Sequence, residues 1–282
     1  TAAGLVAFAM GSETWGSIVS PATRNGVTGL RPTYGRVSRA GAMALSWSMD
    51  KLGPMCRTVE DCALVFDAIR GPDGVDQSVV DRPFNYDYEV DLSRLRIGYE
   101  KEAFEEDYPD KANDQAALDV LRELGAELIP ITLPDYPISS LAFILSAEAA
   151  AAFDDLTRSD RDDLLERQIK NAWPNVFRSA RFIPAVEYIQ ANRVRYELVQ
   201  QMERIFEDVD LYLSPSLIGD NLLLTNLTGH PCVVLPNGFN NQDSPTSITF
   251  IGQLYDEATI LAVARAYQEA TGWHHQHPPL FR

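Results

Sequence analysis

Residues 95–133 carry the pattern that most restricts the fold of this chain. Leu95-Arg96-Ile97-Gly98-Tyr99 predicts a strand, residues 110–124 predict a helix that Gly125 ends, and residues 126–133 predict a second strand that closes in Leu133-Pro134. A strand, a helix and a strand in succession favour parallel pairing within a mixed sheet. We therefore predict an α/β fold, a mixed β-sheet core covered by helices.

The rest of the chain predicts further helices and strands without a clear domain boundary. Thr58 can cap a helix that presents Val59, Cys62, Val65, Phe66 and Ile69 on one face and stops at residues 71–74. We also predict helices over residues 138–170, 184–208 and 256–270, strands over 211–213, 232–235 and 247–251, and a surface loop over 71–93. Residues 1–10 predict the end of a buried helix or a passage from helix to strand, and residues 11–50 predict loops and short strands. One domain over residues 1–282 is the simplest organisation.

Composition excludes some functions. A net charge of −16 argues against direct nucleic-acid binding, which needs a basic surface. No apolar run is long enough for a membrane span, and no signal peptide is visible. We expect a cytoplasmic location, with no targeting information readable at Thr1. The cysteines favour free structural thiols, with a Cys56–Cys62 disulfide as the alternative. His274, His275 and His277 lie in a Pro-rich segment that we place on the surface rather than at a metal.

Residues 11–22 are the candidate site. This run of small residues and hydroxyls suits a tight turn that exposes backbone N–H groups beside a serine hydroxyl. Acyl transfer needs that pairing, a nucleophile with donors aimed at the oxygen that becomes negative. A purely structural turn is the alternative that the residues alone leave open. Motifs of α/β-hydrolases and of nucleotide-binding loops are absent from the sequence.

The same segment resembles the signature of the amidase signature family. The resemblance begins with Gly11-Ser12-Glu13-Thr14-Trp15-Gly16-Ser17-Ile18 and continues through residues 21–22, residues 26–38, Asp50, Gly53-Pro54 and residues 57–63. Far downstream, Asn226-Leu227-Thr228-Gly229-His230-Pro231 resembles the family's Asn-x-x-Gly-x-Pro loop, and residues 256–261 resemble its final helix. The agreement is in order along the chain and covers most of it outside residues 75–180.

The resemblance implies a serine amidase with a Ser–cis-Ser–Lys triad and no cofactor or metal. Ser17 would be the nucleophile, and the N–H groups of Thr14, Trp15, Gly16 and Ser17 would form the oxyanion hole. The bridging Ser and the Lys would both precede Thr1. We therefore expect a C-terminal portion of the enzyme that is inactive alone.

Several positions depart from the family's commonest pattern or invite another role. Trp15 stands where Gly is frequent, and its indole either closes part of the acyl pocket or packs inside. Val19 stands where Arg is frequent, and Glu13 replaces a usual Asp. We expect Lys51 at the surface rather than as the base, and His230 as a structural or pocket-lining residue.

Two other functions stay open. One is the A subunit of a tRNA-dependent amidotransferase, a glutaminase that acts with partner subunits. The other is a relic that kept the fold and lost the chemistry. The expected partner is a small-molecule amide substrate, and the resemblance also allows a homo-oligomer or amidotransferase partner subunits.

Overall fold

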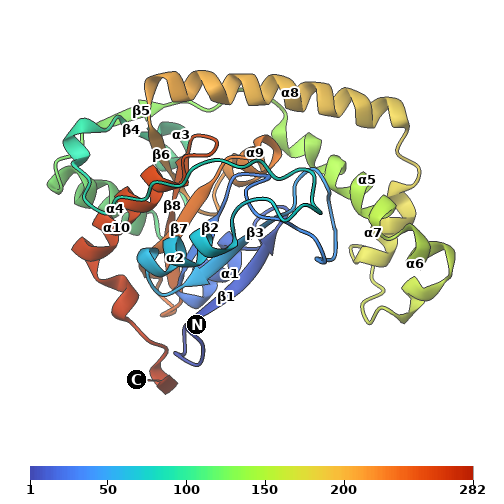
Figure 1. The fold of residues 1–282 in the computed structure, drawn as a ribbon, viewed down its shortest axis with the longest axis horizontal. Helices are drawn as coiled ribbons and strands as arrows, with labels where there is room; N and C mark the ends of the chain where they lie inside the picture. The colour runs from blue at the N-terminus through green and yellow to red at the C-terminus, as the bar shows by residue number, and fades with distance from the viewer. Residues whose placement is uncertain (282) are drawn as a thin grey trace.

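The strands of this chain form one mixed sheet. The structure is a computed structural model that describes residues 1–281. Within them, the sheet has eight strands in the order β1-β3-β2-β7-β8-β6-β4-β5 (Figure 1). The strands are β1 Phe8–Glu13, β2 Thr28–Arg31, β3 Lys51–Cys56, β4 Ile97–Glu100, β5 Leu128–Ile131, β6 Leu211–Pro215, β7 Cys232–Phe239 and β8 Pro245–Gly252.

Strand direction confirms the predicted parallel unit. Strand β4 pairs in parallel with β5, with Ile97 opposite Leu128, and also in parallel with β6. Every other pairing in the sheet is antiparallel. The long return from β5 to β6 therefore carries helices, whereas β7 and β8 are joined by a short turn.

Ten α-helices surround the sheet in the described part of the chain. They are α1 Val19–Asn25, α2 Val59–Ile69, α3 Lys101–Glu105, α4 Lys111–Glu123, α5 Phe143–Ala152, α6 Asp154–Arg158, α7 Trp173–Ala180, α8 Ala185–Asp208, α9 Asn221–Thr228 and α10 Glu257–Thr271. Short 3₁₀ turns lie at Leu92–Arg94, Ile138–Ala142, Arg161–Leu164, Trp273–His275 and Pro279–Phe281. None of the described helices is long and apolar enough to cross a membrane.

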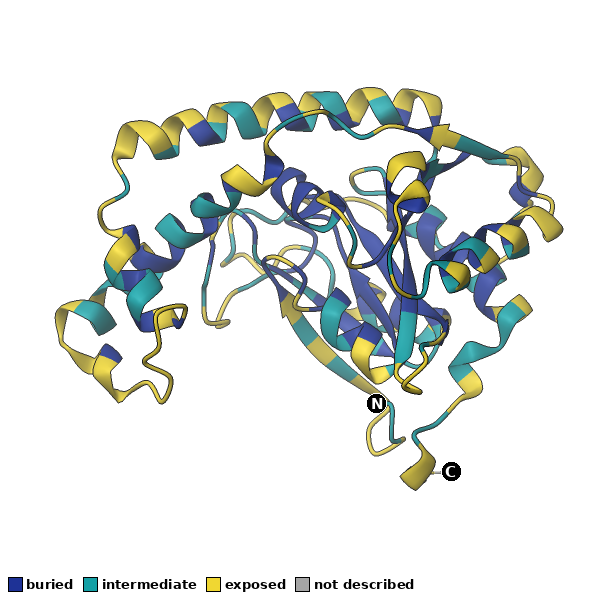
Figure 2. Cartoon of the chain, turned by 180° about the vertical axis from the view of Figure 1, so that it is seen from behind, coloured by how far each residue is buried: buried dark blue, intermediate teal, exposed yellow. Residues whose placement is uncertain are grey.

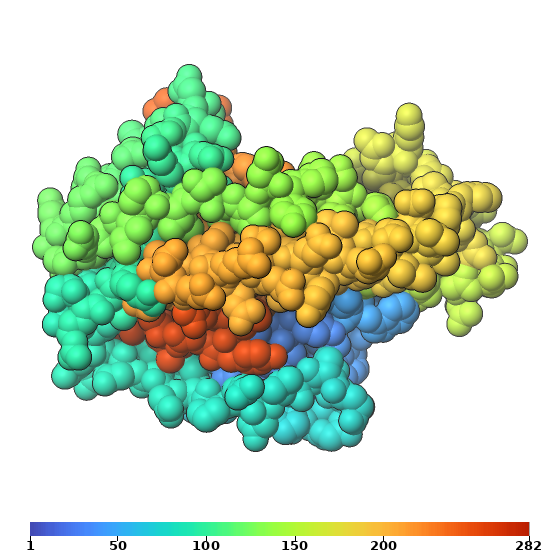
Figure 3. Space-filling view, turned by 90° about the horizontal axis from the view of Figure 1, so that it is seen from above, coloured from blue at the N-terminus to red at the C-terminus, as the bar shows by residue number. Residues whose placement is uncertain are grey.

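The alternation of side chains along the strands divides the core into two layers. On β7, Val233 and Leu235 pack with α2, α4 and α10, whereas Cys232 and Val234 pack with α1, α5, α8 and α9. Both faces of the central strands are thus buried, which Figure 2 shows as dark strands between partly exposed helices. Helix α8 forms a ridge across the upper face of the molecule in Figure 3, and α5, α6 and α7 extend to one side of the sheet (Figure 1).

Several predicted elements are confirmed. The side chain of Thr58 accepts a hydrogen bond from the N–H of Asp61 and caps α2 as expected. Helices α4, α8 and α10 lie within one or two residues of their predicted bounds. All three cysteines are free and buried, so the alternative Cys56–Cys62 disulfide is wrong.

The N-terminal segment differs from the prediction. Residues 1–7 form turns and bends with Leu5 and Val6 exposed, and β1 begins at Phe8. The expected helix is therefore wrong in both alternatives, whereas the strand expected in the second alternative begins at Phe8. Gly4 interrupts the segment before it with a φ of +73°. Helix α1 and strand β3 were not expected as regular elements, because Pro21 and the Gly53-Pro54 pair weaken their patterns.

Candidate active site

A tight turn joins β1 to α1 and presents Ser17. Residues 14–18 have no regular structure, and the Ser17 side chain is exposed. Gly16 has a φ of +102°, and a Cβ at this position would lie 2.9 Å from Cδ2 of Leu222 on α9. The backbone angle favours glycine here, and a side chain would in addition have to displace the end of Leu222. Gly16, the residue directly before Ser17, therefore determines the backbone path of the turn.

The backbone N–H groups of the turn fall into two sets. The N–H groups of Ile18 and Val19 donate to Oε2 of Glu13, at 2.8 and 3.0 Å. Within residues 1–281, the N–H groups of residues 14–17 have no acceptor. Four consecutive free donors beside an exposed hydroxyl can bind an oxygen on which negative charge develops.

The buried carboxylate of Glu13 anchors the turn to the sheet and to α9. Its side chain is fully buried, and Oε1 accepts from Arg31 at 2.8 Å and from Asn226 at 2.7 Å. Burial raises the pKa of this carboxyl, but the charge of Arg31 and the hydrogen bonds outweigh burial and leave the pKa below its ordinary value. Glu13 is therefore ionised and ties β1, β2 and α9 to the turn. Asn226, the first residue of the downstream motif, has this structural role.

Arg31 completes the buried network behind the turn. Its guanidinium also donates to Oγ1 of Thr225 at 2.8 Å and to the carbonyl of His230 at 3.0 Å. His230 stacks on Phe206 and its Nδ1 shares a hydrogen bond with Thr228. Burial and the nearby Arg31 charge lower the pKa of His230 to about 3, so the imidazole is neutral. His230 is a packed structural residue, as the sequence favoured.

Lys51 is buried, contrary to the prediction that it lies at the surface. It is the cross-strand partner of Glu13 in the β1–β3 pair, and only 2% of it is exposed. Its Nζ donates to the carbonyl of Met49. Burial and the charge of Arg31 lower its pKa to about 7, against the opposite effect of Glu13. The register of β3 explains the error, because it turns this side chain inward.

A loop that the sequence did not single out links the turn to the next part of the site. Oδ1 of Asp50 accepts a hydrogen bond from Oγ1 of Thr14 at 2.5 Å. The other oxygen, Oδ2, accepts from the N–H groups of Leu45 and Ser46 at 2.8 and 2.9 Å. Asp50 thus fastens residues 45–50 to the turn that carries Ser17. The sequence offered Asp50 only as part of a motif, without its partners.

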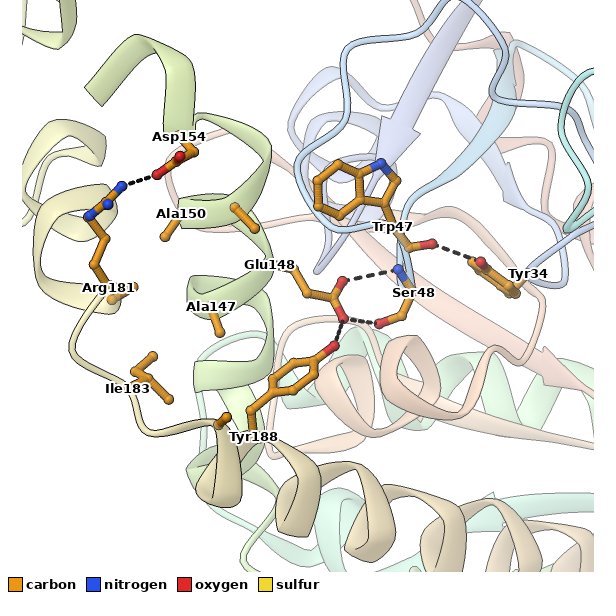
Figure 4. Close-up of a pocket in the computed structure, with 13 residues that line it drawn as sticks. Tyr34, Trp47, Ser48, Ala147, Glu148, Ala150, Asp154, Arg181, Ile183 and Tyr188 are labelled. Carbon is orange, nitrogen blue, oxygen red and sulfur yellow. Dashed lines mark hydrogen bonds and ion pairs between the residues drawn. The ribbon is translucent and has the colours of Figure 1, made fainter. Parts of the chain in front are cut away.

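The same loop is fastened on its other side to α5. Glu148 accepts hydrogen bonds from the hydroxyl and the N–H of Ser48 and from the hydroxyl of Tyr188 (Figure 4). It also accepts one from the hydroxyl of Ser46. Burial raises the pKa of Glu148, but these four donors outweigh burial and lower it. Glu148 is therefore an ionised group whose oxygens are fully engaged. No signal in the sequence marked it.

A cavity of about 710 Å³ opens between this loop and the helices α5, α7 and α8. Its walls are mostly alanine methyl groups and aromatic rings (Figure 4). The lining residues are Tyr34, Trp47, Ser48, Ala147, Glu148, Ala150, Ala151, Asp154, Ala180, Arg181, Ile183, Ala185 and Tyr188. Ser17 and Trp15 do not line it. Trp15 is 47% exposed, so its indole is not packed inside.

The described residues contain no group of three or more His, Cys, Asp or Glu side chains that could hold a metal ion. The chain thus has an exposed serine, a row of free N–H donors and, between the loop 45–50 and the helices α5, α7 and α8, a largely apolar cavity. A hydroxyl with neighbouring free N–H donors is a pair of groups that acyl transfer through a serine requires.

Comparison with known proteins gives a family match and relatives that cover nearly the whole chain. The model of the family described as Amidase matches residues 1–221. The glutamyl-tRNA(Gln) amidotransferase A subunit of Roseiflexus castenholzii is 36% identical over 98% of this chain. The chain spans 65% of the length of that relative.

Solved structures of an amidase and of an amidotransferase subunit share the fold of this chain. The peptide amidase of Stenotrophomonas maltophilia superposes with a TM-score of 0.80 at 26% identity, covering 96% of this chain and 63% of that one. The glutamyl-tRNA(Gln) amidotransferase A subunit of Thermotoga maritima gives 0.79 at 26% identity, over 95% and 63%. This chain belongs to the amidase family, and it has that family's fold, as the resemblance implied.

Proposed function

We propose that Ser17 is the nucleophile of an amidase that hydrolyses a carboxamide through an acyl-enzyme. The observation that carries the proposal is the row of free N–H groups at residues 14–17, which lies directly beside the exposed Ser17 hydroxyl. Membership of the amidase family supports the reaction class.

The chemistry follows from these groups. The Ser17 oxygen attacks the carbonyl carbon, and the carbonyl oxygen becomes an oxyanion that the N–H groups of residues 14–17 stabilise. The C–N bond then breaks, ammonia or an amine leaves with a proton, and water releases the carboxylic acid from Ser17. One such donor contributes about 3–4 kcal/mol to stabilisation of the transition state.

A base must accept the proton of Ser17. The Ser17 hydroxyl has no hydrogen-bond partner within residues 1–281, and Lys51 is engaged with Met49 in the interior. In line with the family resemblance, we propose that a Lys and a bridging Ser from sequence before Thr1 supply this base.

Hydrolysis of a carboxamide by two forms of the protein tests the proposal. A protein of residues 1–282 is compared with a form that is extended at its N-terminus by the residues encoded upstream of Thr1. We expect ammonia release by the extended form and a rate at least about 100-fold lower for the given chain. Ser17→Ala should abolish release, while Ser20→Ala, a hydroxyl one turn further along, should retain it. Undiminished hydrolysis by Ser17→Ala in an active protein would overturn the assignment.

A second candidate function is the A subunit of a tRNA-dependent amidotransferase. The relative that carries this name is 36% identical to the chain. In that case glutamine hydrolysis would appear only with partner subunits and charged tRNA present. Hydrolysis of simple amides by the extended protein alone would favour the free amidase.

A further inference from the structure

The cavity between the loop 45–50 and the helices α5, α7 and α8 is lined mostly by uncharged side chains. Five of its lining residues are alanines, and Ile183 adds a further aliphatic side chain. Trp47, Tyr34 and Tyr188 supply aromatic rings (Figure 4). A volume of about 710 Å³ is in the range of sites that bury a small organic ligand.

The charged side chains in its walls are already paired. The Glu148 carboxylate accepts from four donors. Asp154 accepts from both Arg158 and Arg181. Within the described chain, the cavity thus offers no unpaired cation to a carboxylate and no unpaired carboxylate to an ammonium group. An ionised ligand would lose its hydration without gaining a partner, which disfavours its binding.

The cavity is mechanically joined to the nucleophile turn. Trp47 and Ser48 lie on the loop that Asp50 fastens to Thr14, and Thr14 is the first residue of the row of free N–H donors. Asp50 therefore connects the turn to the loop that carries two of the residues lining the cavity.

Resting on the proposed function, we infer that this cavity receives the uncharged apolar part of the amide substrate. It favours an arylalkyl carboxamide over an amide that carries an α-amino acid group, such as glutamine. The flat rings of Trp47 and Tyr188 and the methyl groups of α5 provide the contact surfaces for an aromatic ring.

Direct binding tests this inference without turnover. The Ser17→Ala chain is titrated in a calorimeter with 4-phenylbutanamide and, separately, with L-glutamine. We expect the Kd for 4-phenylbutanamide to be at least about tenfold lower than the Kd for L-glutamine. Binding of glutamine with equal or greater affinity, or no detectable binding of the aryl amide, would overturn the inference.

A variant that fills the cavity localises the binding. Ala151→Phe places a ring in the cavity from an exposed position on α5, so the core is not overpacked. It should weaken binding of 4-phenylbutanamide at least about tenfold. Ala116→Phe, an exposed alanine of α4 outside the cavity, is the matched control and should bind as before. Thermal unfolding confirms that both variants are folded, and unchanged binding by Ala151→Phe would contradict the inference.

The two proposals fail separately. Loss of the aryl preference with intact Ser17-dependent hydrolysis removes only the cavity assignment. Binding that follows the expected pattern, together with hydrolysis that does not depend on Ser17, removes only the nucleophile assignment.

Discussion

At the residue scale, Gly16 shows how one position controls the turn that carries Ser17. Its positive φ alone makes a side chain costly, and the contact with Leu222 adds to that cost. Gly41 has a similar φ of +79° with open space around it. We expect Gly41→Ala to lower the free energy of unfolding by about 1 kcal/mol and Gly16→Ala to lower it by more. Urea unfolding of both variants measures the difference, and equal losses would show that the Leu222 contact is unimportant.

Lys51 makes a second prediction at this scale, on pH dependence. Its pKa falls from 10.5 to about 7 on folding. Between these pH values the unfolded chain holds a proton that the folded chain has released, so stability should rise with pH through this window. Lys51→Met should lack that part of the rise and should be more stable than the parent at pH 6, by a few kcal/mol at most.

Chemical unfolding from pH 6 to pH 10.5 measures this effect as the difference between variant and parent. Lys101→Met, which changes an exposed lysine, is the control and should follow the parent. A Lys51→Met protein that is less stable than the parent at pH 6 would mean that the amine, through its bond to Met49, stabilises the folded state.

At the element scale, Glu13 joins three elements through one carboxylate. Glu13→Gln leaves Arg31 buried without its ion-pair partner, and removing one member of such a pair typically costs about 3–5 kcal/mol. We expect a loss of that order in thermal or urea unfolding. Asp67→Asn disrupts an exposed ion pair with Arg70 and should cost less than about 0.5 kcal/mol. A loss for Glu13→Gln as small as that control would contradict the role assigned to the network.

Elements with strong periodicity could be predicted from the sequence, and others could not. Helix α8 and the unit β4–α4–β5 follow from apolar spacing that local sequence contains. Strand β3 has Gly53 and Pro54 in its middle, and Gly53 approaches the carbonyl of Leu30 so closely that a Cβ would lie 2.0 Å from it. That strand is set by its neighbours rather than by its own propensity.

The residues of the candidate site also divide into those that local sequence predicts and those that it does not. Ser17 and the turn are local and could be predicted by resemblance. The partners of Glu13 lie 18 and 213 residues away, and Glu148 lies 102 residues from Ser46. Such contacts depend on the assembled sheet, so sequence spacing does not show them.

At the scale of the whole molecule, the helical extension α5–α7 should be less stable than the sheet. Helix α6 has no buried residue, whereas seven of the eight residues of β7 are buried. Hydrogen exchange should therefore protect amides of β7 far more than those of α6. Mass spectrometry of peptides from the two elements measures this, and equal protection would indicate that the extension unfolds only with the core.

The three free cysteines make local opening of the fold chemically detectable. Cys56 and Cys62 lie in the layer with α2, and Cys232 lies in the opposite layer, all out of reach of solvent. A thiol reagent in native buffer can react only when a layer lifts from the sheet. Each side of the sheet thus contains its own chemical probe, and the order in which the thiols are labelled reports which side opens first.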